Sequence, residues 1–429
     1  MTPLAKSARP WRRCSRRSAV LARIALIRAD RLNCIVASMP AAAAKPTHPG
    51  YARLHFASFL GLFCVGVYAT SFGPALPFLA EHFGVSLDRA GLLITVLFVG
   101  SIGASGAIAV YLHRFEARLL ALLGLVIVAA GALGLAATSS WTVGLLSVGI
   151  IGIGDGLLVA AAHSAVASTA ADVPHGINRL NLWFAVGAVA GPVWAGAILA
   201  ARGEHAVIYV GVAAISIAVA VLLATVPRTP ARSHEHEVHG GSIRSRPVFM
   251  MGAVLFLYVG AEIGLGSWVS SYSTEAFGAG VMGGALVTAG YWGALMIGRI
   301  VSGSLFARGV SPVTVLLGSI AGALVTSSAL ALADGSLAIG VASAFGTGLF
   351  FGPIWPAAIT LASQGSASGA PAAMVTIGNA GGILFPWLQG KVLVAAGPGR
   401  GIALTALLCL LMLGIVASYC RRLVKAGVG

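Results

Sequence analysis

The sequence predicts an all-α integral membrane protein with twelve transmembrane helices in two pseudo-symmetric six-helix bundles. Three observations lead to this fold class. Of the 429 residues, 58% are hydrophobic and only 9% are charged, whereas soluble domains carry about 25% charged residues. Twelve apolar segments have about the 20-residue length of a membrane-spanning helix. Glycine and proline positions also recur between the two halves of the chain at a constant offset.

The twelve apolar segments form two groups of six that a polar linker separates. We expect a basic N-terminal tail at 1–54, an N-terminal bundle at 55–226, a cytoplasmic linker at 227–247, a C-terminal bundle at 248–420 and a cytoplasmic tail at 421–429. Long apolar runs exclude a transmembrane β-barrel, and the 57 glycines favour closely packed helices. The expected spans are 56–79, 89–112, 118–138, 142–166, 178–201, 206–226, 248–273, 281–306, 312–332, 337–362, 372–396 and 401–420.

We expect the tail at 1–54 to be disordered, or translation to start later, at Met39. A segment that lies on the surface of anionic lipid is the alternative.

The basic residues indicate how the chain is oriented in the membrane. The net charge is +15, and 11 of the 27 Lys and Arg residues precede residue 54. Most of the others lie on the side of the linker, so the positive-inside rule places both termini in the cytoplasm. We therefore expect a monomeric multi-pass protein of the inner (plasma) membrane, and the charge placement argues against a nucleic-acid partner. The five cysteines have no metal-binding spacing, and we expect neither a metal nor a cofactor.

Matching positions in the two halves are 194 residues apart. Arg114 and Arg308 share this offset, as do several glycines and a proline: Gly152 with Gly346, Gly154 with Gly348, Gly187 with Gly381, Pro192 with Pro386, and Gly196 with Gly390. A repeat shifted by six spans keeps its orientation in the membrane. Parallel repeats that hold a substrate between them are typical of secondary transporters with alternating access.

Two acidic residues, Asp155 and Glu262, lie well inside the expected spans. A charged side chain at the centre of a bilayer costs roughly 3 kcal/mol, and acids retained there usually serve a substrate, an ion or a proton. His163 lies two helical turns after Asp155 and could line the same cavity. We expect Glu262, Asp155 and His163 to couple transport to protons, and interhelical hydrogen bonding is the alternative.

Aromatic and amide side chains are candidates for contacts with the solute. Aromatic faces can stack on the apolar face of a sugar ring, and amides can hydrogen-bond its hydroxyl groups. An interfacial aromatic belt and interhelical hydrogen bonds are the respective alternatives. The candidates are Trp268, Tyr291, Trp292, Trp355, Asn181 and Asn379. Arginines at the linker side, Arg114, Arg118, Arg299 and Arg308, could close a gate by pairing with acids or helix C-termini.

Together, these features resemble the major facilitator superfamily over residues 55 to 420. The superfamily's loop motif, Gly-x-x-x-Asp-Arg-x-Gly-Arg-Arg, is only partly kept. Arg114 and Arg118 match it, whereas Ala109, His113, Glu116 and Ala117 depart from it. In the second half Gly303 and Arg308 match, and Ala307 replaces the aspartate.

Within the superfamily the chain is similar to the fucose-permease-like branch, which is related to fucose:proton symporters. Glu262 with Trp268 and Tyr272, then Tyr291-Trp292 before Arg299, carry this resemblance. The segments 178–192 and 351–356 also fit. The resemblance adds Gly191 and Pro192 as gating candidates. That branch commonly has an acid four residues before an asparagine in the fourth span, where this chain has Val159 and His163.

From these features we expect a secondary active transporter that moves a small organic solute, such as a sugar, across the lipid bilayer together with protons. Efflux of drugs or metabolites by the same fold is the alternative, and a membrane sensor without transport is a third. The sequence contains no Gly-x-x-x-x-Gly-Lys-[Ser/Thr] loop, which disfavours an ATP-driven pump. We do not expect an enzyme.

Overall fold

The computed structural model describes residues 49–111, 115–226, 246–333, 335–363 and 370–425. Every element in these ranges is a helix. Eleven of the described helical segments are long and apolar enough to cross a membrane. The remaining expected span, 372–396, corresponds to the 27-residue helix α14 (Ala370–Ala396), in which Asn379, Gln389 and Lys391 interrupt the apolar sequence.

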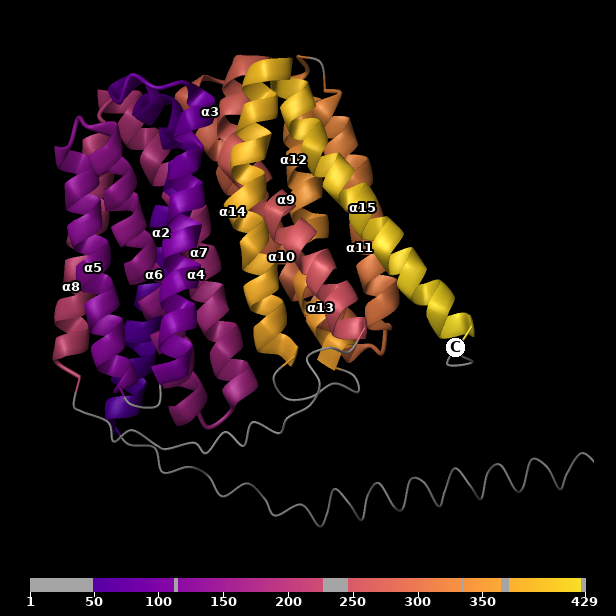
Figure 1. Ribbon diagram of the computed structural model, residues 1–429, viewed down its shortest axis with the longest axis horizontal. Coiled ribbons are helices and arrows are strands. Elements are labelled where there is room, and N and C mark those ends of the chain that lie inside the picture. Colours follow the sequence, from indigo (N-terminus) through magenta and orange to yellow (C-terminus); the bar gives the residue numbers. More distant parts are fainter. Residues whose placement is uncertain (1–48, 112–114, 227–245, 334, 364–369, 426–429) are drawn as a thin grey trace, which may run out of the picture. The chain divides into compact units, whose positions relative to one another are not determined.

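The chain runs back and forth between two ends of the bundle (Figure 1). We call the end where α8 stops and α9 starts the linker end, and the opposite end, where α2 meets α3, the distal end. The first half contains α2 (Pro49–His82), α3 (Leu87–Ala90), α4 (Leu92–Tyr111), α5 (Ala117–Ala137), α6 (Trp141–Thr169), α7 (Val173–Arg202) and α8 (His205–Ala224). The second half contains α9 (Arg246–Phe277), α10 (Gly280–Ala307), α11 (Pro312–Ala331), α12 (Leu337–Phe351), α13 (Ile354–Ser363), α14 and α15 (Pro398–Lys425).

The described helices begin slightly earlier than the expected spans. α2 starts at Pro49 and α9 at Arg246, so the last residues of the expected tail and linker are helical. The remainder of the tail at 1–54 and of the linker at 227–247 lies outside the described residues, as does the end of the tail at 421–429.

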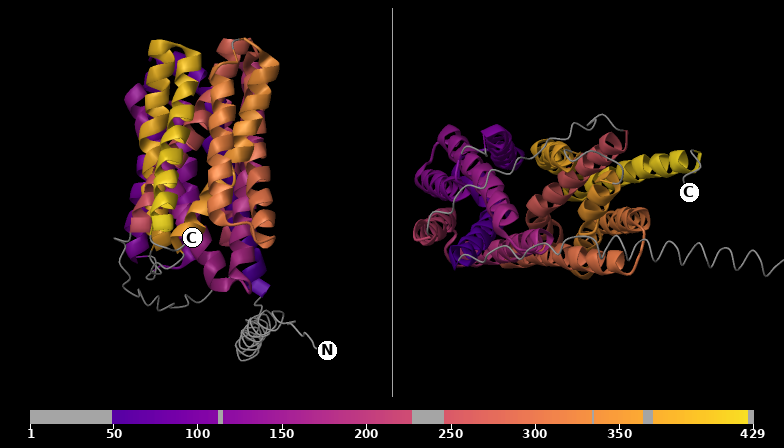
Figure 2. Two further views of the ribbon diagram at one scale, coloured as in Figure 1. Left: turned by 90° about the vertical axis from the view of Figure 1, so that its right-hand side faces the viewer. Right: turned by 90° about the horizontal axis from the view of Figure 1, so that it is seen from below.

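The two halves repeat the same pattern of helix packing, and Figure 2 shows them as two groups when seen from the linker end. In the first half α2 packs on α7, α4 on α6, and α5 on both α6 and α8. In the second half α9 packs on α14, α10 on α12, and α11 on both α12 and α15. These pairs correspond one to one after a shift of six spans. The prediction of two pseudo-symmetric six-helix bundles is therefore confirmed.

Glycines allow these helices to approach each other closely. Gly187 of α7 lies directly against the carbonyl of Phe63 in α2, and Gly381 of α14 lies against the carbonyl of Phe256 in α9. A larger side chain at either glycine would collide with the backbone of the partner helix. Gly187 and Gly381 are therefore equivalent positions, as the offset of 194 residues predicts.

The same offset is wrong for the glycines of the fourth and tenth spans. Gly152 lies against Leu97 of α4, but Gly346, its expected counterpart, lies against α11. Gly348 instead lies against Tyr291 of α10, the helix equivalent to α4. The counterpart of Gly152 is thus 196 residues away (348 − 152). In this register Gly156 corresponds to Gly352, which lies against α10 as Gly156 lies against α4. Two glycines therefore match in either register, and the sequence does not distinguish them.

The two halves contact each other mainly through three helix pairs: α2 with α9, α7 with α10, and α4 with α14. In addition, α14 contacts α3 and α10 contacts α2. Gly73 of α2 lies against the Gly266 carbonyl of α9, and Gly196 of α7 lies against Ala285 of α10. Both contacts lie towards the distal end of their helices. At the linker end, by contrast, Asn181 of α7 is exposed.

Replacing Gly124 by alanine should test whether glycine contacts stabilise the bundle. A Cβ atom there would lie 2.8 Å from the Gly154 carbonyl oxygen and 2.9 Å from the Leu158 nitrogen, both in α6. Overpacking of this kind typically costs 1–3 kcal/mol, so the melting temperature in detergent should fall. At Gly103 nothing lies within 4 Å of the added atom. Gly103→Ala should therefore leave the melting temperature unchanged or raise it, and equal losses in both variants would contradict the packing role.

Candidate functional site

Asp155 of α6 is buried at the junction of three helices in the first half. Its Oδ1 accepts a hydrogen bond of 2.5 Å from the Tyr68 hydroxyl of α2, and its Oδ2 accepts one of 2.5 Å from the Ser101 hydroxyl of α4. The neighbouring Gly156 brings the two helices together, because it lies directly against the Ser101 carbonyl. Among the described residues, no cation forms an ion pair with Asp155. Hydroxyl groups alone compensate this carboxyl group.

Glu262 of α9 is also buried, but it pairs with a cation. The Arg299 Nη2 of α10 donates to Glu262 Oε1 over 3.0 Å, and the carboxylate side chain is 7% exposed. The Tyr291 hydroxyl of α10 donates to the Glu262 backbone carbonyl over 2.9 Å. Each half therefore buries one acid within its long helices, and the two acids are compensated in different ways.

Three hydrogen-bond donors around Glu262 are unused in the described part of the structure. They are the Tyr258 hydroxyl, the Trp292 indole Nε1 and the Arg299 Nε, each buried without a hydrogen-bond partner. Tyr258 lies close enough to both charged groups to interact with them, although not with ordinary hydrogen-bond geometry. A buried donor without a partner costs about 1–3 kcal/mol. A ligand that supplies acceptor oxygens would remove this cost.

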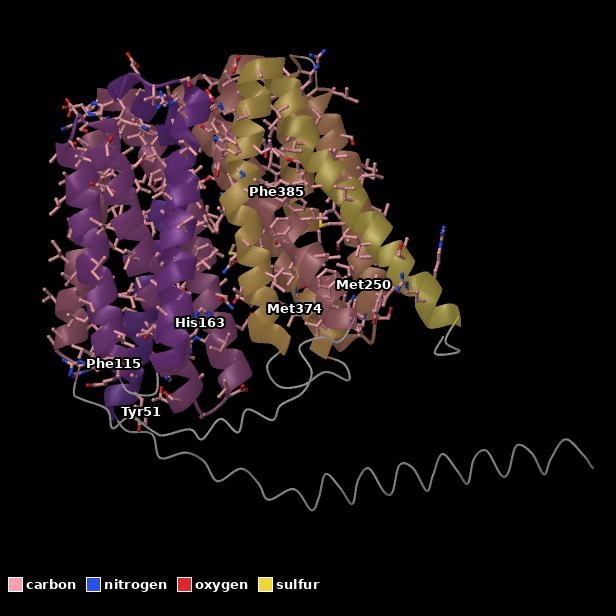
Figure 3. The ribbon with its side chains drawn as sticks, viewed as in Figure 1. Tyr51, Phe115, His163, Met250, Met374 and Phe385 are labelled. Atoms are coloured by element: carbon pink, nitrogen blue, oxygen red, sulfur yellow. The ribbon has the colours of Figure 1, made fainter. Side chains whose placement is uncertain are left out.

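His163 does not join Asp155 in one network. Its Nδ1 lies 2.8 Å from the Val159 carbonyl, and its ring interacts with the Asn181 side chain of α7. Figure 3 shows His163 towards the linker end of the first half. The structure therefore brings together two of the predicted residues, His163 and Asn181, at a place separate from the contacts of Asp155.

The four aromatic candidates have different surroundings. The Trp268 Nε1 donates to the Pro386 carbonyl over 2.6 Å, and its fully buried ring lies against Gly91 and Gly390. Trp268 is thus part of the packing at the distal end in this conformation. The other three lie around the Glu262 segment of α9. The Tyr291 hydroxyl donates to the Glu262 carbonyl, Trp292 packs on Gly266 one turn after Glu262, and the Trp355 ring lies 6.3 Å from the ring of Tyr258, one turn before Glu262.

The remaining candidates lie on two equivalent helices, Asn379 on α14 and both Gly191 and Pro192 on α7. Asn379 of α14 is partly exposed. Gly191 of α7 packs on Val67 of α2, and its carbonyl accepts from the Ser71 hydroxyl over 3.2 Å. Pro192 lies within α7. These contacts of Gly191 are internal to the first half.

The arginine candidates also differ. The Arg118 guanidinium donates to the Leu223 and Ala224 carbonyls over 3.1 and 2.9 Å, so it caps the C-terminus of α8 within the first half. Arg308 is the exposed C-cap residue of α10, and Arg299 pairs with Glu262. Arg114 lies outside the described residues. The expectation that an arginine binds a helix C-terminus is met at Arg118, by a contact that does not join the halves.

The distal end carries an ion pair between the halves that the sequence did not reveal. The Lys391 Nζ of α14 lies 2.6 Å from Asp88 Oδ2 of α3. Nearby, the Thr95 hydroxyl of α4 donates to the Ile383 carbonyl of α14 over 2.7 Å. The only sequence signal was that Lys391 is one of few basic residues on this side. Its partner lies 303 residues away (391 − 88), which no local pattern could indicate.

The described residues contain no group of three or more histidine, cysteine, aspartate or glutamate side chains that could hold a metal ion. The chemistry that this arrangement supports is the binding of protons and of polar molecules at buried acids and donors.

The sequence also matches the model of a known protein family. The model of the Major Facilitator Superfamily matches residues 58–386. The chain belongs to the Major Facilitator Superfamily. It is therefore a membrane transporter of a small solute and not an enzyme, and the family resemblance found in the sequence is confirmed.

One curated relative of this Major Facilitator Superfamily chain is Bypass of stop codon protein 6 of Saccharomyces cerevisiae. The two are 29% identical over 191 residues, which is 40% of this chain and 36% of the relative. The chain therefore matches little more than a third of the relative's length.

Solved structures of transporters share the fold. The nucleoside transporter NupG gives a TM-score of 0.67 at 13% identity, with 87% of this chain and 99% of that chain covered. The E. coli fucose:proton symporter FucP (N162A) gives 0.59 at 20% identity, covering 86% and 97%. A POT family transporter gives 0.69 at 14% identity, covering 87% and 96%.

Neutralising Lys391 should weaken the closure of this Major Facilitator Superfamily transporter at its distal end. A partly exposed ion pair contributes about 0.2–1 kcal/mol, so Lys391→Gln should open the distal end about twofold to fivefold more often. The measurement is the rate at which a membrane-impermeant maleimide labels Ala90→Cys, a fully buried position in α3, after the native cysteines have been replaced by serine.

Arg400→Gln is the matched control, because Arg400 is an exposed cation at the same end of the bundle. The exchanged pair Asp88→Lys with Lys391→Asp should restore slow labelling. Equal labelling rates in Lys391→Gln and Arg400→Gln would show that the ion pair does not hold the distal end closed.

Proposed function

We propose that the protein is a proton-coupled secondary transporter of a small hydroxylated organic solute, such as a sugar, that works by alternating access. The observation that supports this best is the contrast between the two acids buried within its long helices. Among the described residues Asp155 has only hydroxyl partners, whereas Glu262 is balanced by Arg299 and surrounded by donors that are unused.

Asp155 is the better candidate for the transported proton. An ionised carboxyl group in a low-dielectric interior without a counter-charge is costly, and taking up a proton removes that cost. Tyr68 and Ser101 can hydrogen-bond either form of the carboxyl group, and they belong to two other helices. When α2 or α4 moves, Asp155 loses or gains a donor, so its proton affinity changes with the conformation. Glu262 can bind its proton only at the expense of the ion pair with Arg299.

The surroundings of Glu262 suit a solute with several hydroxyl groups. Such a solute offers acceptor oxygens to Tyr258, Trp292 and Arg299, whose donors are unused, and its own hydroxyls can donate to Glu262. Few well-placed polar groups in an otherwise apolar and aromatic setting are typical of small-molecule sites. The fucose:proton symporter and the nucleoside transporter NupG share this fold and carry hydroxylated solutes, which supports the same class here.

In the proposed orientation the protein lies in the plasma membrane with its linker end in the cytoplasm. Basic residues concentrate at the linker end, which supports this orientation. The named contacts between the halves lie towards the distal end, including Asp88 with Lys391 and Thr95 with Ile383. In this orientation the described conformation is the one closed to the outside. Separation of the distal contacts would give the alternate state.

Asp155→Asn should uncouple transport from protons without abolishing solute exchange. A screen of neutral hexoses, deoxyhexoses, pentitols and nucleosides for thermal stabilisation of the purified protein first identifies the solute. In proteoliposomes with an imposed pH gradient, Asp155→Asn should then lower accumulation of that labelled solute tenfold or more, because an amide cannot take up the proton. Exchange of labelled for unlabelled solute should persist.

Asp172→Asn is the control, since Asp172 caps α7 through a hydrogen bond from the His175 N–H and asparagine caps helices equally well. It should leave accumulation and exchange unchanged. Proton-driven accumulation by Asp155→Asn at the wild-type level would refute its role. Proton-driven accumulation that is found only in inside-out vesicles would favour efflux as the direction of transport.

Glu262→Gln should reduce solute binding and thermal stability together, because it leaves the Arg299 charge unpaired and buried. Breaking a buried ion pair by removing one partner costs about 3–5 kcal/mol, and the partial exposure of Arg299, 31% of its side chain, reduces this figure. Solute binding is measured by equilibrium dialysis. Wild-type accumulation in Glu262→Gln would exclude Glu262 from both binding and coupling.

A further inference from the structure

A separate cavity of about 330 Å³ lies at the distal end, between α2 of the first half and α9 of the second. Its size is within the range of small-molecule sites, about 300–1,000 Å³. Ser271, which lines it, comes nine residues after Glu262 on α9, or roughly 13 Å along the helix. On α9, the close contact of Gly266 with Gly73 of α2 lies between the two places. The cavity is therefore distinct from the surroundings of Glu262.

The wall formed by α2 is apolar. Pro74, Pro77 and Phe78 line the cavity on this side. The proline rings carry no N–H group, so they present a hydrocarbon surface, and Phe78 adds an aromatic ring. Such a surface suits the apolar face of a ring-shaped ligand.

The wall formed by α9 is polar, and one of its hydroxyl groups is unused. The Thr274 hydroxyl donates to the Ser270 carbonyl one turn earlier, over 3.1 Å. In contrast, the Ser271 hydroxyl is buried and has no hydrogen-bond partner in the described part of the chain, and Ser271 as a whole is only 7% exposed. The Ser267 carbonyl, to which Ser271 would bond by the same pattern, lies against Gly73 of α2. Rotation about χ1 can turn the Ser271 hydroxyl towards a bound molecule.

Glu275 supplies a carboxylate at the rim of the cavity. A carboxylate accepts hydrogen bonds from hydroxyl donors that are about twice as strong as those between neutral groups. An acceptor carboxylate, a free hydroxyl and a flat apolar wall together fit a neutral ring with several hydroxyl groups. A cation would be drawn to Glu275 but would gain nothing from Ser271 as a donor.

We infer that this distal cavity is a second binding site for a neutral polyhydroxylated solute, outside the central site and separated from it by the contact of Gly73 with Gly266. This inference rests on the proposed function for the class of solute. A molecule bound there contacts both halves, through α2 and α9, while the distal end is closed. When α2 and α9 separate, it can pass to the surroundings of Glu262.

The test counts bound molecules per chain on the purified wild-type protein. Equilibrium dialysis is run separately with labelled D-glucose, D-galactose and L-fucose. At least one of these sugars should bind at two sites. Ser271→Ala should weaken one of the two sites about threefold to tenfold, the effect expected for one hydrogen bond. The same change removes an unsatisfied hydroxyl group, so the melting temperature should not fall.

Ser273→Ala is the matched control on the same helix, because the Ser273 hydroxyl already donates to the Val269 carbonyl over 2.7 Å. It should leave both sites unchanged. Glu275→Gln should weaken the same site as Ser271→Ala. A single bound sugar in the wild type, unaffected by Ser271→Ala, would overturn the second site while leaving the proposed function intact.

Two other outcomes separate the inference from the proposed function. If tetraethylammonium, and no sugar, binds in a way that Glu275→Gln abolishes, the cavity takes cations and the inference is wrong. If no sugar binds at either site and none is accumulated in proteoliposomes, the proposed function fails as well.

Discussion

Carboxyl groups inside an apolar bundle need hydrogen-bond donors from neighbouring helices, and this requirement constrains the packing around both acids. Asp155 receives its donors from α2 and α4, and α4 can come near enough because small residues flank the acid. Gly152 and Gly156 both lie directly against α4. The glycines of α6 thus allow the close packing through which its buried acid reaches hydrogen-bond donors.

The two halves share a packing pattern but not a charge pattern. The first half holds an acid whose charge nothing balances among the described residues, and the second holds a balanced pair, Glu262 with Arg299. The two halves of a pseudo-symmetric fold can therefore have different roles, with proton binding in the first half and solute binding in the second. Helix movements that are equivalent in geometry then have different chemical consequences in each half.

Much of the fold could be predicted from sequence, because span length and apolar composition are local properties. The site was harder to predict. Glu262 and Arg299 were both singled out, but as a proton site and a gate, since their pairing depends on how α9 packs against α10. Tyr68 gave no signal, because a tyrosine in an apolar span looks like a packing residue until an acid on another helix is placed beside it. The register of Gly152 against Gly348 was ambiguous because two glycines match at an offset of 194 and two at an offset of 196.

Helix α14 carries a proline between its contacts with the other half. Before this point the Ile383 carbonyl accepts from Thr95 of α4, and after it Lys391 pairs with Asp88 of α3. Pro386 has no N–H group, so the Gly382 carbonyl lacks its usual helical donor and the helix is weakened there. The last three turns can therefore swing about this pivot while the earlier turns stay in place. Bending at this single turn of α14 can then release the contact of Lys391 with Asp88 as α2 and α9 separate, so the two movements need not occur as one rigid displacement.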